Sequence, residues 1–153
     1  MTHTQFGNPD QALIQRFIEA GQHPLLIDSN PLAIALKSTL VRVDRDQGVV
    51  DISFDPPDQF LQGTGVLQGG IISAMLDFGM AFATLATLPS HASCASVNLT
   101  SSFIRPAPPG IYTVTGLVDR CGKTLAFTQA RLDRKSTRLN SSHIPLSRMP
   151  SSA

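Results

Sequence analysis

The chain has 153 residues, which suits one domain, and 42% hydrophobic against 15% charged residues favours a globular fold over disorder. The net charge is +1, but four of the twelve basic residues and none of the acidic ones lie after residue 133. Residues 1–133 therefore carry 8 basic against 11 acidic side chains. A mildly acidic body differs from the basic surfaces that bind nucleic acid, so we expect no nucleic-acid partner.

The two cysteines, Cys94 and Cys121, stand far apart and form no metal-binding motif with histidine. We therefore expect no metal and no cofactor, and two free thiols fit a reducing compartment. Residues 1–6 lack the basic and apolar pattern of a secretory signal. Together these features predict a cytoplasmic protein.

The predicted elements follow a simple order along the chain. Asn8 followed by proline predicts a capped helix, and Gly21 ends its apolar stripe. A long apolar stretch, rich in alanine, methionine and leucine, lacks the alternation of a strand and predicts a helix that is buried on most sides. The expected elements are helix 9–20, strands 35–43 and 49–54, helix 69–87, and strands 95–104, 111–118 and 124–132. This order predicts an α+β fold with an antiparallel sheet against one central helix.

Asp77 lies inside the long apolar helix and is the only charged residue between Asp58 and Arg105. A carboxylate is costly to bury, so such a residue is usually paired, neutralised or catalytic. Its position also argues against a membrane-spanning helix, because an acid near the centre of a span costs about 2.5–3.5 kcal/mol. We therefore expect a core helix and no membrane contact.

Three short motifs occur in order on these elements. The first is Gly65-Val66-Leu67-Gln68-Gly69-Gly70 followed by Met75-Leu76-Asp77; the second runs from Ser96 to Ala107 and ends in Phe-Ile-Arg-Pro-Ala; the third is Gly122-Lys123-Thr124-Leu125-Ala126-Phe127. With them, residues 35–133 resemble the hotdog-fold acyl-CoA thioesterases, in the branch of the phenylacetyl-CoA and hydroxybenzoyl-CoA enzymes. The resemblance implies a curved antiparallel sheet wrapped around the central helix. It also implies an acyl-CoA substrate and a homodimer, or a dimer of dimers, with active sites at the subunit interface.

The resemblance assigns catalytic roles to Gly69, Gln68, Asp77 and Ser96 and a substrate-binding role to Gly70. It implies that the Gly69 amide at the helix N-terminus binds the oxyanion, and that Gly70 lets the substrate approach the backbone closely. Asp77 would be the general base or nucleophile, and Ser96 would hold the water near it. Asp77 lies eight residues, or about 12 Å, along the helix from Gly69. A partner subunit is therefore expected to bring its Gly69 to this Asp77.

The catalytic candidate Gln68 stands where many relatives have histidine, and it can orient the carbonyl but cannot transfer a proton. Three further residues are, with Gly70, candidates for binding the substrate. Gln62 stands where many relatives have an asparagine that contacts the carbonyl, and its extra methylene displaces the amide. Arg105 and Lys123 are candidate contacts for the phosphates of coenzyme A.

Two other functions remain open from the sequence. A hotdog dehydratase would need a histidine beside the acid, and the one histidine of the central region, His91, lies outside any such motif. A catalytically silent acyl-CoA-binding or dimerisation module would fit the replacement at Gln62 and the altered C-terminus.

The sequence predicts three parts: an N-terminal helix and loop at 1–34, the hotdog domain at 35–133, and a tail at 134–153. The tail is rich in serine, arginine and proline and has no period, so we expect it to be disordered and non-native, with a basic interaction tail as the alternative. The hotdog domain would then lack a final strand and leave an exposed sheet edge.

Overall fold

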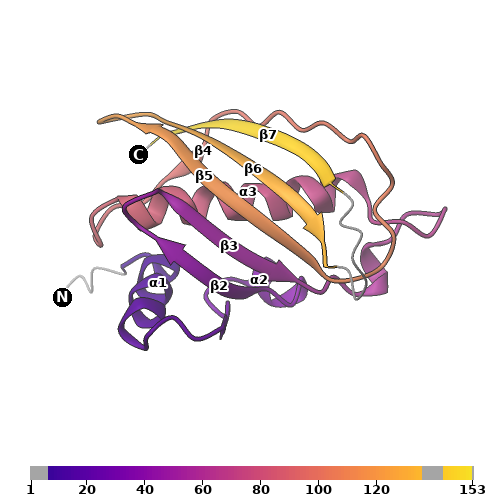
Figure 1. The fold of residues 1–153 in the computed structure, drawn as a ribbon, viewed down its shortest axis with the longest axis horizontal. Helices are drawn as coiled ribbons and strands as arrows, with labels where there is room; N and C mark the ends of the chain where they lie inside the picture. Colours follow the sequence, from indigo (N-terminus) through magenta and orange to yellow (C-terminus); the bar gives the residue numbers. More distant parts are fainter. Residues whose placement is uncertain (1–6, 136–142, 153) are drawn as a thin grey trace, which may run out of the picture.

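The computed structural model describes residues 7–135 and 143–152. Within these residues, the helices lie in the first part of the chain, up to residue 87, and strands alone follow α3 (Figure 1). The elements are α1 (Pro9–Glu19), β1 (Leu25–Leu26), α2 (Pro31–Ala35), β2 (Thr39–Asp44), β3 (Val49–Phe54), the 3-10 turn η1 (Asp58–Phe60), α3 (Gly69–Thr87), β4 (Ala95–Ser96), β5 (Tyr112–Cys121), β6 (Ala126–Arg134) and β7 (His143–Ser152).

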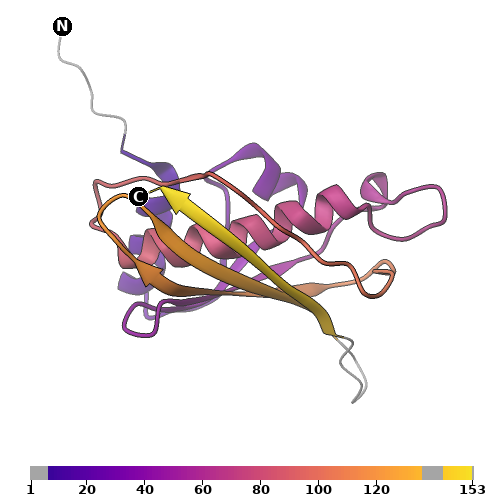
Figure 2. The same ribbon diagram turned by 90° about the horizontal axis from the view of Figure 1, so that it is seen from above.

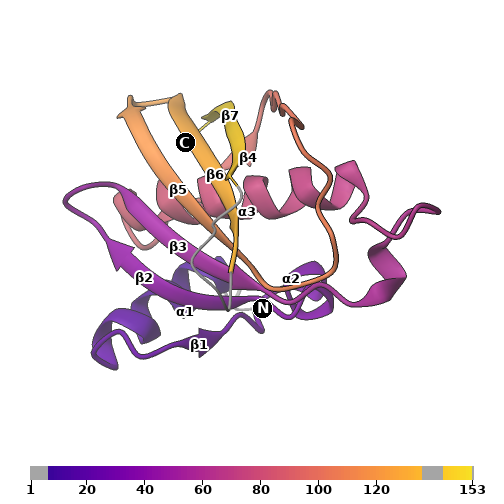
Figure 3. The same ribbon diagram turned by 45° about the vertical axis from the view of Figure 1, so that its right-hand side comes forward.

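The described strands form one antiparallel sheet in the order β1-β2-β3-β5-β6-β7-β4. The sheet curls around α3, which lies along its inner face (Figures 2 and 3). This is the hotdog arrangement, and the predicted α+β class is confirmed. The helix N-terminus faces the loop that follows η1, while its C-terminus lies near α1 (Figure 1).

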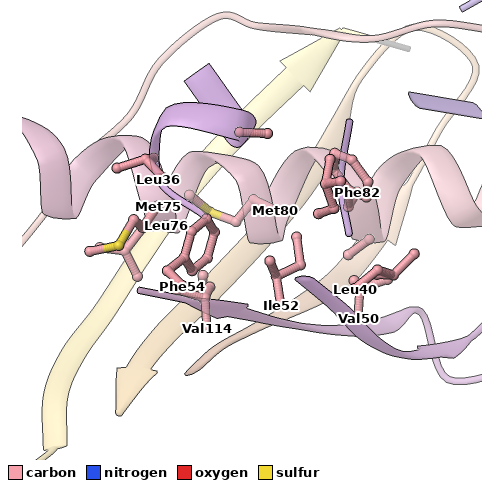
Figure 4. Close-up of a cluster of buried hydrophobic side chains, with 14 of the residues drawn as sticks. Leu36, Leu40, Val50, Ile52, Phe54, Met75, Leu76, Met80, Phe82 and Val114 are labelled. Atoms are coloured by element: carbon pink, nitrogen blue, oxygen red, sulfur yellow. The ribbon is translucent and has the colours of Figure 1, made fainter. Parts of the chain in front are cut away.

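The core forms between α3 and the inner face of strands β2, β3 and β5. Side chains of the helix interdigitate with alternate residues of the strands, as the period of two in a strand requires (Figure 4). The cluster includes Leu40, Val50, Ile52, Phe54, Met75, Leu76, Met80, Phe82 and Val114. By length and composition α3 could cross a membrane, but 56% of its most apolar window is buried in this structure, which is the setting of a core helix.

Two glycines allow α3 to approach the sheet closely. Gly79 faces β5, and a Cβ atom on it would overlap the side chain of Val114. Gly116 lies on β5, and a Cβ atom there would overlap the backbone carbonyl of Gly79 and reach within 3.0 Å of the Met80 nitrogen. The helix therefore packs backbone to backbone against the centre of the sheet.

The N-terminal part differs from the prediction in two places. Leu25 and Leu26 pair with β2 as strand β1, so part of the predicted N-terminal segment belongs to the sheet. Residues 35–38 are the end of α2 and a turn rather than strand, and Lys37 adopts a positive φ of 49° there. The loose alternation of residues 35–43 does not distinguish this turn from the strand that follows it.

The predicted strand 95–104 is much shorter in the structure. Only Ala95 and Ser96 form β4, paired with Ser152 and Ser151. The rest of the segment runs along α3, where side-chain contacts hold it. The apolar and polar alternation of residues 97–104 thus predicts its extended shape but not its pairing.

The expectation of a disordered tail is wrong for residues 143–152. These residues form β7, which pairs with β6 along most of its length and with β4 at its end. An edge strand offers unpaired backbone donors and acceptors to any extended chain, so the tail can pair there without a strand-like sequence period. Of the other predicted tail residues, Arg134 ends β6 and Lys135 follows it, whereas 136–142 and 153 lie outside the described residues.

Candidate active site

The N-terminus of α3 presents free backbone amides to solvent. Gln68 is the N-cap, with extended backbone angles and no side-chain capping bond. The amides of Gly69 and Gly70 have no acceptor among the residues that the structure describes, as expected for the first turn of a helix. These amides and the helix dipole favour a negatively charged oxygen at this point.

The loop before α3 holds this helix end in place. The amide of Gln62 donates to the carbonyl of Val66 at 2.8 Å, and Gly65, with φ of 80°, closes the turn. The amide of Leu67 donates to the carbonyl of Ala107 at 2.7 Å, which joins the loop to the segment before β5. A positive φ is a conformation that glycine adopts without strain, so Gly65 suits this turn.

A groove of about 550 Å³ opens beside the helix N-terminus. Its size lies within the range of about 300–1,000 Å³ that is typical of small-molecule sites. The walls are mostly apolar, with an amide, a hydroxyl and a guanidinium among them. The lining residues are Gln62, Thr64, Val66, Leu67, Gly69, Ile72, Phe103, Ile104, Arg105, Pro106 and Ala107.

The predicted acid is paired with the predicted serine. The hydroxyl of Ser96 donates to the Oδ1 atom of Asp77 at 2.7 Å. Asp77 is half-buried on α3, whereas Ser96 is exposed on β4. The structure therefore joins two residues that are 19 positions apart in the sequence, and this bond fixes one oxygen of the carboxylate.

The segment from Ser96 to Phe103 runs antiparallel to α3 and covers one stripe of the helix. Ser101 accepts a hydrogen bond from the hydroxyl of Ser73 at 3.1 Å. The ring of Phe103 would contact a Cβ atom on Gly69 at 3.6 Å. Gly69, Ser73 and Asp77 are spaced four residues apart and therefore lie on one face of the helix. Phe103 was not predicted as a site residue. In the predicted strand 95–104 it is two residues from Ser101, so both side chains are expected on the same face of that strand.

The same stripe separates the two main catalytic candidates. Gly69 and Asp77 are about 12 Å apart along the helix axis, at 1.5 Å per residue. A single thioester carbonyl cannot contact the Gly69 amide and the Asp77 carboxylate of the same chain. Within one chain, these two groups therefore do not meet at a single reacting carbon.

The two basic candidates lie at opposite ends of the molecule. Arg105 lines the groove near the N-terminus of α3. Lys123 lies in the turn between β5 and β6 (Figure 1). This turn is at the end of the sheet near the C-terminus of α3, where Gly48 lies close to Val118 and Thr87. In that turn region the Arg120 guanidinium lies 5.2 Å from the centre of the Phe127 ring. Arg105 and Lys123 of one chain therefore cannot bind the same phosphate.

Cys94 lies close to the acid, which the sequence did not indicate. Burial, with smaller contributions from the carboxylates of Asp77 and Asp10, raises the pKa of its thiol to about 11. Its sulfur lies 3.9 Å from the carbonyl oxygen of Ala81 on α3. A thiol with this pKa stays protonated at neutral pH and is a poor nucleophile, so Cys94 fits a structural role.

The remaining predicted residues lie near the helix N-terminus. Gln68 is exposed at the N-cap position, and Gln62 is exposed on the groove wall. Gly70 has no atom within 4 Å of the place that a Cβ would occupy, so open space adjoins its backbone. Among the described residues, no group of three or more histidine, cysteine, aspartate or glutamate side chains could hold a metal ion.

Comparisons with known proteins identify the family and similar folds. The sequence model of the Thioesterase superfamily matches residues 64–141, which is just over half of the chain and includes α3, β4 and β5. A comparison with curated protein sequences gives no match.

Solved structures of similar proteins cover nearly the whole chain. The phenylacetic acid degradation-related protein of Ralstonia eutropha JMP134 superposes with a TM-score of 0.76 at 26% identity, over 90% of this chain and 98% of that one. A thioesterase family protein from Silicibacter pomeroyi has a TM-score of 0.76 at 18% identity, over 94% and 96% of the two chains. The E. coli PaaI protein from the phenylacetic acid degradation operon has a TM-score of 0.72 at 18% identity, over 95% and 94%. The last two similarities concern the fold alone.

Proposed function

Because this chain belongs to the thioesterase superfamily, we propose that it hydrolyses an acyl-CoA thioester to a free acid and coenzyme A. The observation that carries the proposal is the arrangement on one face of α3. An acid held by a serine lies at one end of this face, and free amides at the helix N-terminus lie at the other. These are the groups that general-base hydrolysis of a carbonyl compound requires.

In the proposed reaction, Asp77 accepts a proton from a water molecule while the water oxygen attacks the thioester carbon. The bond from Ser96 to Oδ1 leaves Oδ2 of the carboxylate available to the water. The carbonyl oxygen becomes an oxyanion, which the Gly69 amide of the other subunit stabilises by a hydrogen bond. When the tetrahedral intermediate collapses, the carbon–sulfur bond breaks, and the leaving thiolate takes the proton from Asp77.

The groove supports a medium-sized aromatic or aliphatic acyl group. Its apolar walls would exclude water from such a group, and Gln62 and Gln68 lie where their amides could orient the carbonyl. The similarity to a phenylacetic acid degradation-related protein supports an aromatic acid as the first substrate to test. Arg105 of one subunit, at the groove, and Lys123 of the other, in the β5–β6 turn, would bind phosphates of the same coenzyme A molecule.

The 12 Å gap between Gly69 and Asp77 supports a symmetric dimer as the active unit. If a two-fold axis pairs Asp77 with the partner's Gly69, the reverse pair forms at the same time, and the two α3 helices run antiparallel. Ser73 lies midway between the two residues, so the two-fold axis would pass at its level, through the segment from Ser96 to Phe103 that covers this stripe. Exposed apolar side chains on the segment beside this face, Val97 at 63% and Ile104 at 72% exposure, are suited to burial in such an interface.

Disulfide cross-linking tests this register. In a chain with Cys94 and Cys121 replaced by serine, the variant Ser102→Cys should form a covalent dimer under mild oxidation, because this exposed residue follows Ser101, which contacts Ser73 at the level of the axis, and bridged Cα atoms lie within about 7 Å. Ala81→Cys is the control, because in the proposed dimer the two copies of residue 81 would be about 24 Å apart along the helix axis. Dimers that cross-link at 81 but not at 102 would contradict the register, and a monomer in sedimentation would contradict the dimer.

A hydrolysis assay with a panel of acyl-CoA substrates tests the activity. We expect Asp77→Asn to lower kcat by orders of magnitude while the oligomeric state is retained. Asp46→Asn, which removes an exposed acid from the β2–β3 turn, is the control and should keep full activity. Turnover that is indifferent to Asp77→Asn would refute the mechanism. Binding of acyl-CoA without turnover by the unmodified protein would instead support the silent binding module.

A further inference from the structure

Gln11 is a buried polar residue of α1 that contacts the end of the catalytic helix. Only 1% of its surface is exposed. Its Nε2 atom lies 2.9 Å from the carbonyl oxygen of Leu85, 3.3 Å from that of Pro89 and 3.5 Å from that of Ala92. An amide nitrogen carries two hydrogens, so the Leu85 bond is the main one and the two loop carbonyls share the other.

These contacts reinforce the end of α3. The helix ends without a glycine, and the amide of its C-cap Leu88 donates to the carbonyls of Thr84 and Leu85 at 3.2 Å. Gln11 adds a second donor to the Leu85 carbonyl from another helix and reaches the following loop with the same group. Asn8 adds a second link, because its Nδ2 atom donates to the Ser93 hydroxyl at 3.1 Å.

The loop that α1 holds leads directly to the acid's partner. Residues 88–93 are followed by Cys94, whose sulfur lies against α3, and then by β4. β4 has only two residues and lies at the end of the strand order, so the sheet alone holds Ser96 weakly. The position of Ser96 along α3 therefore depends on where the loop is fixed.

We propose that Gln11 is a positioning residue for the Asp77–Ser96 pair. The effect of Gln11 on catalysis rests on the proposed function, whereas its effect on the position of Ser96 does not. Gln11 lies away from the reacting carbonyl, because its main partner Leu85 lies eight residues, or about 12 Å, along α3 from Asp77. Its effect passes through the loop to Ser96 and from Ser96 to the carboxylate.

The variant Gln11→Met tests this role. Methionine has a similar length and keeps the packing of α1, but it removes both hydrogen-bond donors and the Oε1 atom, which is buried without a partner. We expect kcat to fall by up to about tenfold, the effect of losing one well-placed hydrogen bond, while KM stays within about twofold. The matched control is Gln15→Met, a half-buried glutamine on the same helix, which should leave both parameters unchanged.

A double-mutant cycle separates positioning from general destabilisation. In a Ser96→Ala background, Gln11→Met should cause no further loss of kcat, because the group that it positions is already gone. An equal loss in both backgrounds would mean that Gln11 acts only through stability and would overturn the proposal. Unchanged kcat in a folded Gln11→Met protein would overturn it as well.

Amide hydrogen exchange provides a readout that does not depend on activity. Gln11→Met should speed exchange in residues 88–98 and leave residues 69–75 and β5 unchanged. If the unmodified protein shows no hydrolysis, the proposed function fails, and the exchange pattern still decides whether Gln11 places Ser96. Faster exchange throughout α3 and β5, or no change in residues 88–98, would refute the positioning role.

Discussion

Replacement of Gly116 by alanine should destabilise the fold at its centre. The new Cβ atom would overlap the carbonyl of Gly79 and lie 3.0 Å from the Met80 nitrogen, whereas atoms in contact prefer about 3.5–4.0 Å. The obstacle is helix backbone, which cannot rotate away as a side chain can, so α3 would have to move from the sheet by roughly 1 Å or more. Overpacking of this kind costs about 3 kcal/mol, and the lower backbone entropy of unfolded alanine offsets about 0.5–1 kcal/mol.

The net loss of about 2 kcal/mol or more should lower Tm by about 4–8 °C in a protein of this length, measured by thermal denaturation and checked by urea unfolding. Gly79→Ala should have a smaller effect, since its Cβ meets the side chain of Val114 and alanine is the better helix residue by about 1 kcal/mol. Gly70→Ala is the control, because nothing lies within 4 Å of its Cβ position. A Gly116→Ala protein with the Tm of the unmodified chain would refute the close contact between α3 and β5.

Three further predictions concern substrate binding, thiol chemistry and a buried hydrogen bond. Arg105→Ala and Lys123→Ala should each raise KM for acyl-CoA without lowering kcat, and neither should affect hydrolysis of a small thioester that lacks the nucleotide. The pKa of Cys94, raised by burial from 9.0 to about 11, should slow its alkylation at pH 8 by about 100-fold relative to an ordinary thiol. The unfolded thiol ionises near pH 9 and the folded one near 11, so stability should fall as pH rises through this window, and less so in Cys94→Ala. Tyr112→Phe removes the 2.6 Å bond to the Pro108 carbonyl and should cost about 1 kcal/mol in urea unfolding.

Most of the architecture could be predicted because each element carries a local period. The run from Gly69 to Thr87 has the composition of a buried helix, and the structure begins and ends α3 at those residues. The hairpin of β2 and β3 and the strands β5 and β6 follow the predicted alternation closely. Asp77 stood out because a charge in an apolar helix is costly, and the structure gives it a hydrogen-bond partner.

The features that were missed depend on pairing between distant segments. Strand β7 has no strand-like period, and it forms because β6 offers it an edge. The segment after Ser96 alternates like a strand, yet it lies against α3. Gln11 shows no signal in the sequence, since a single glutamine on an amphipathic helix is usually solvated, and only packing of α1 against α3 buries it.

Local patterns in the sequence predicted most of the elements and the face of α3 that carries Gly69 and Asp77, because a helix fixes such spacing within a few turns. The tertiary structure decided which groups meet. It brought Ser96 to Asp77, set Gly116 against Gly79, and placed Arg105 and Lys123 at opposite ends of the helix. These contacts join residues far apart in the chain, and their geometry depends on how the whole sheet curls around α3, which no local pattern specifies.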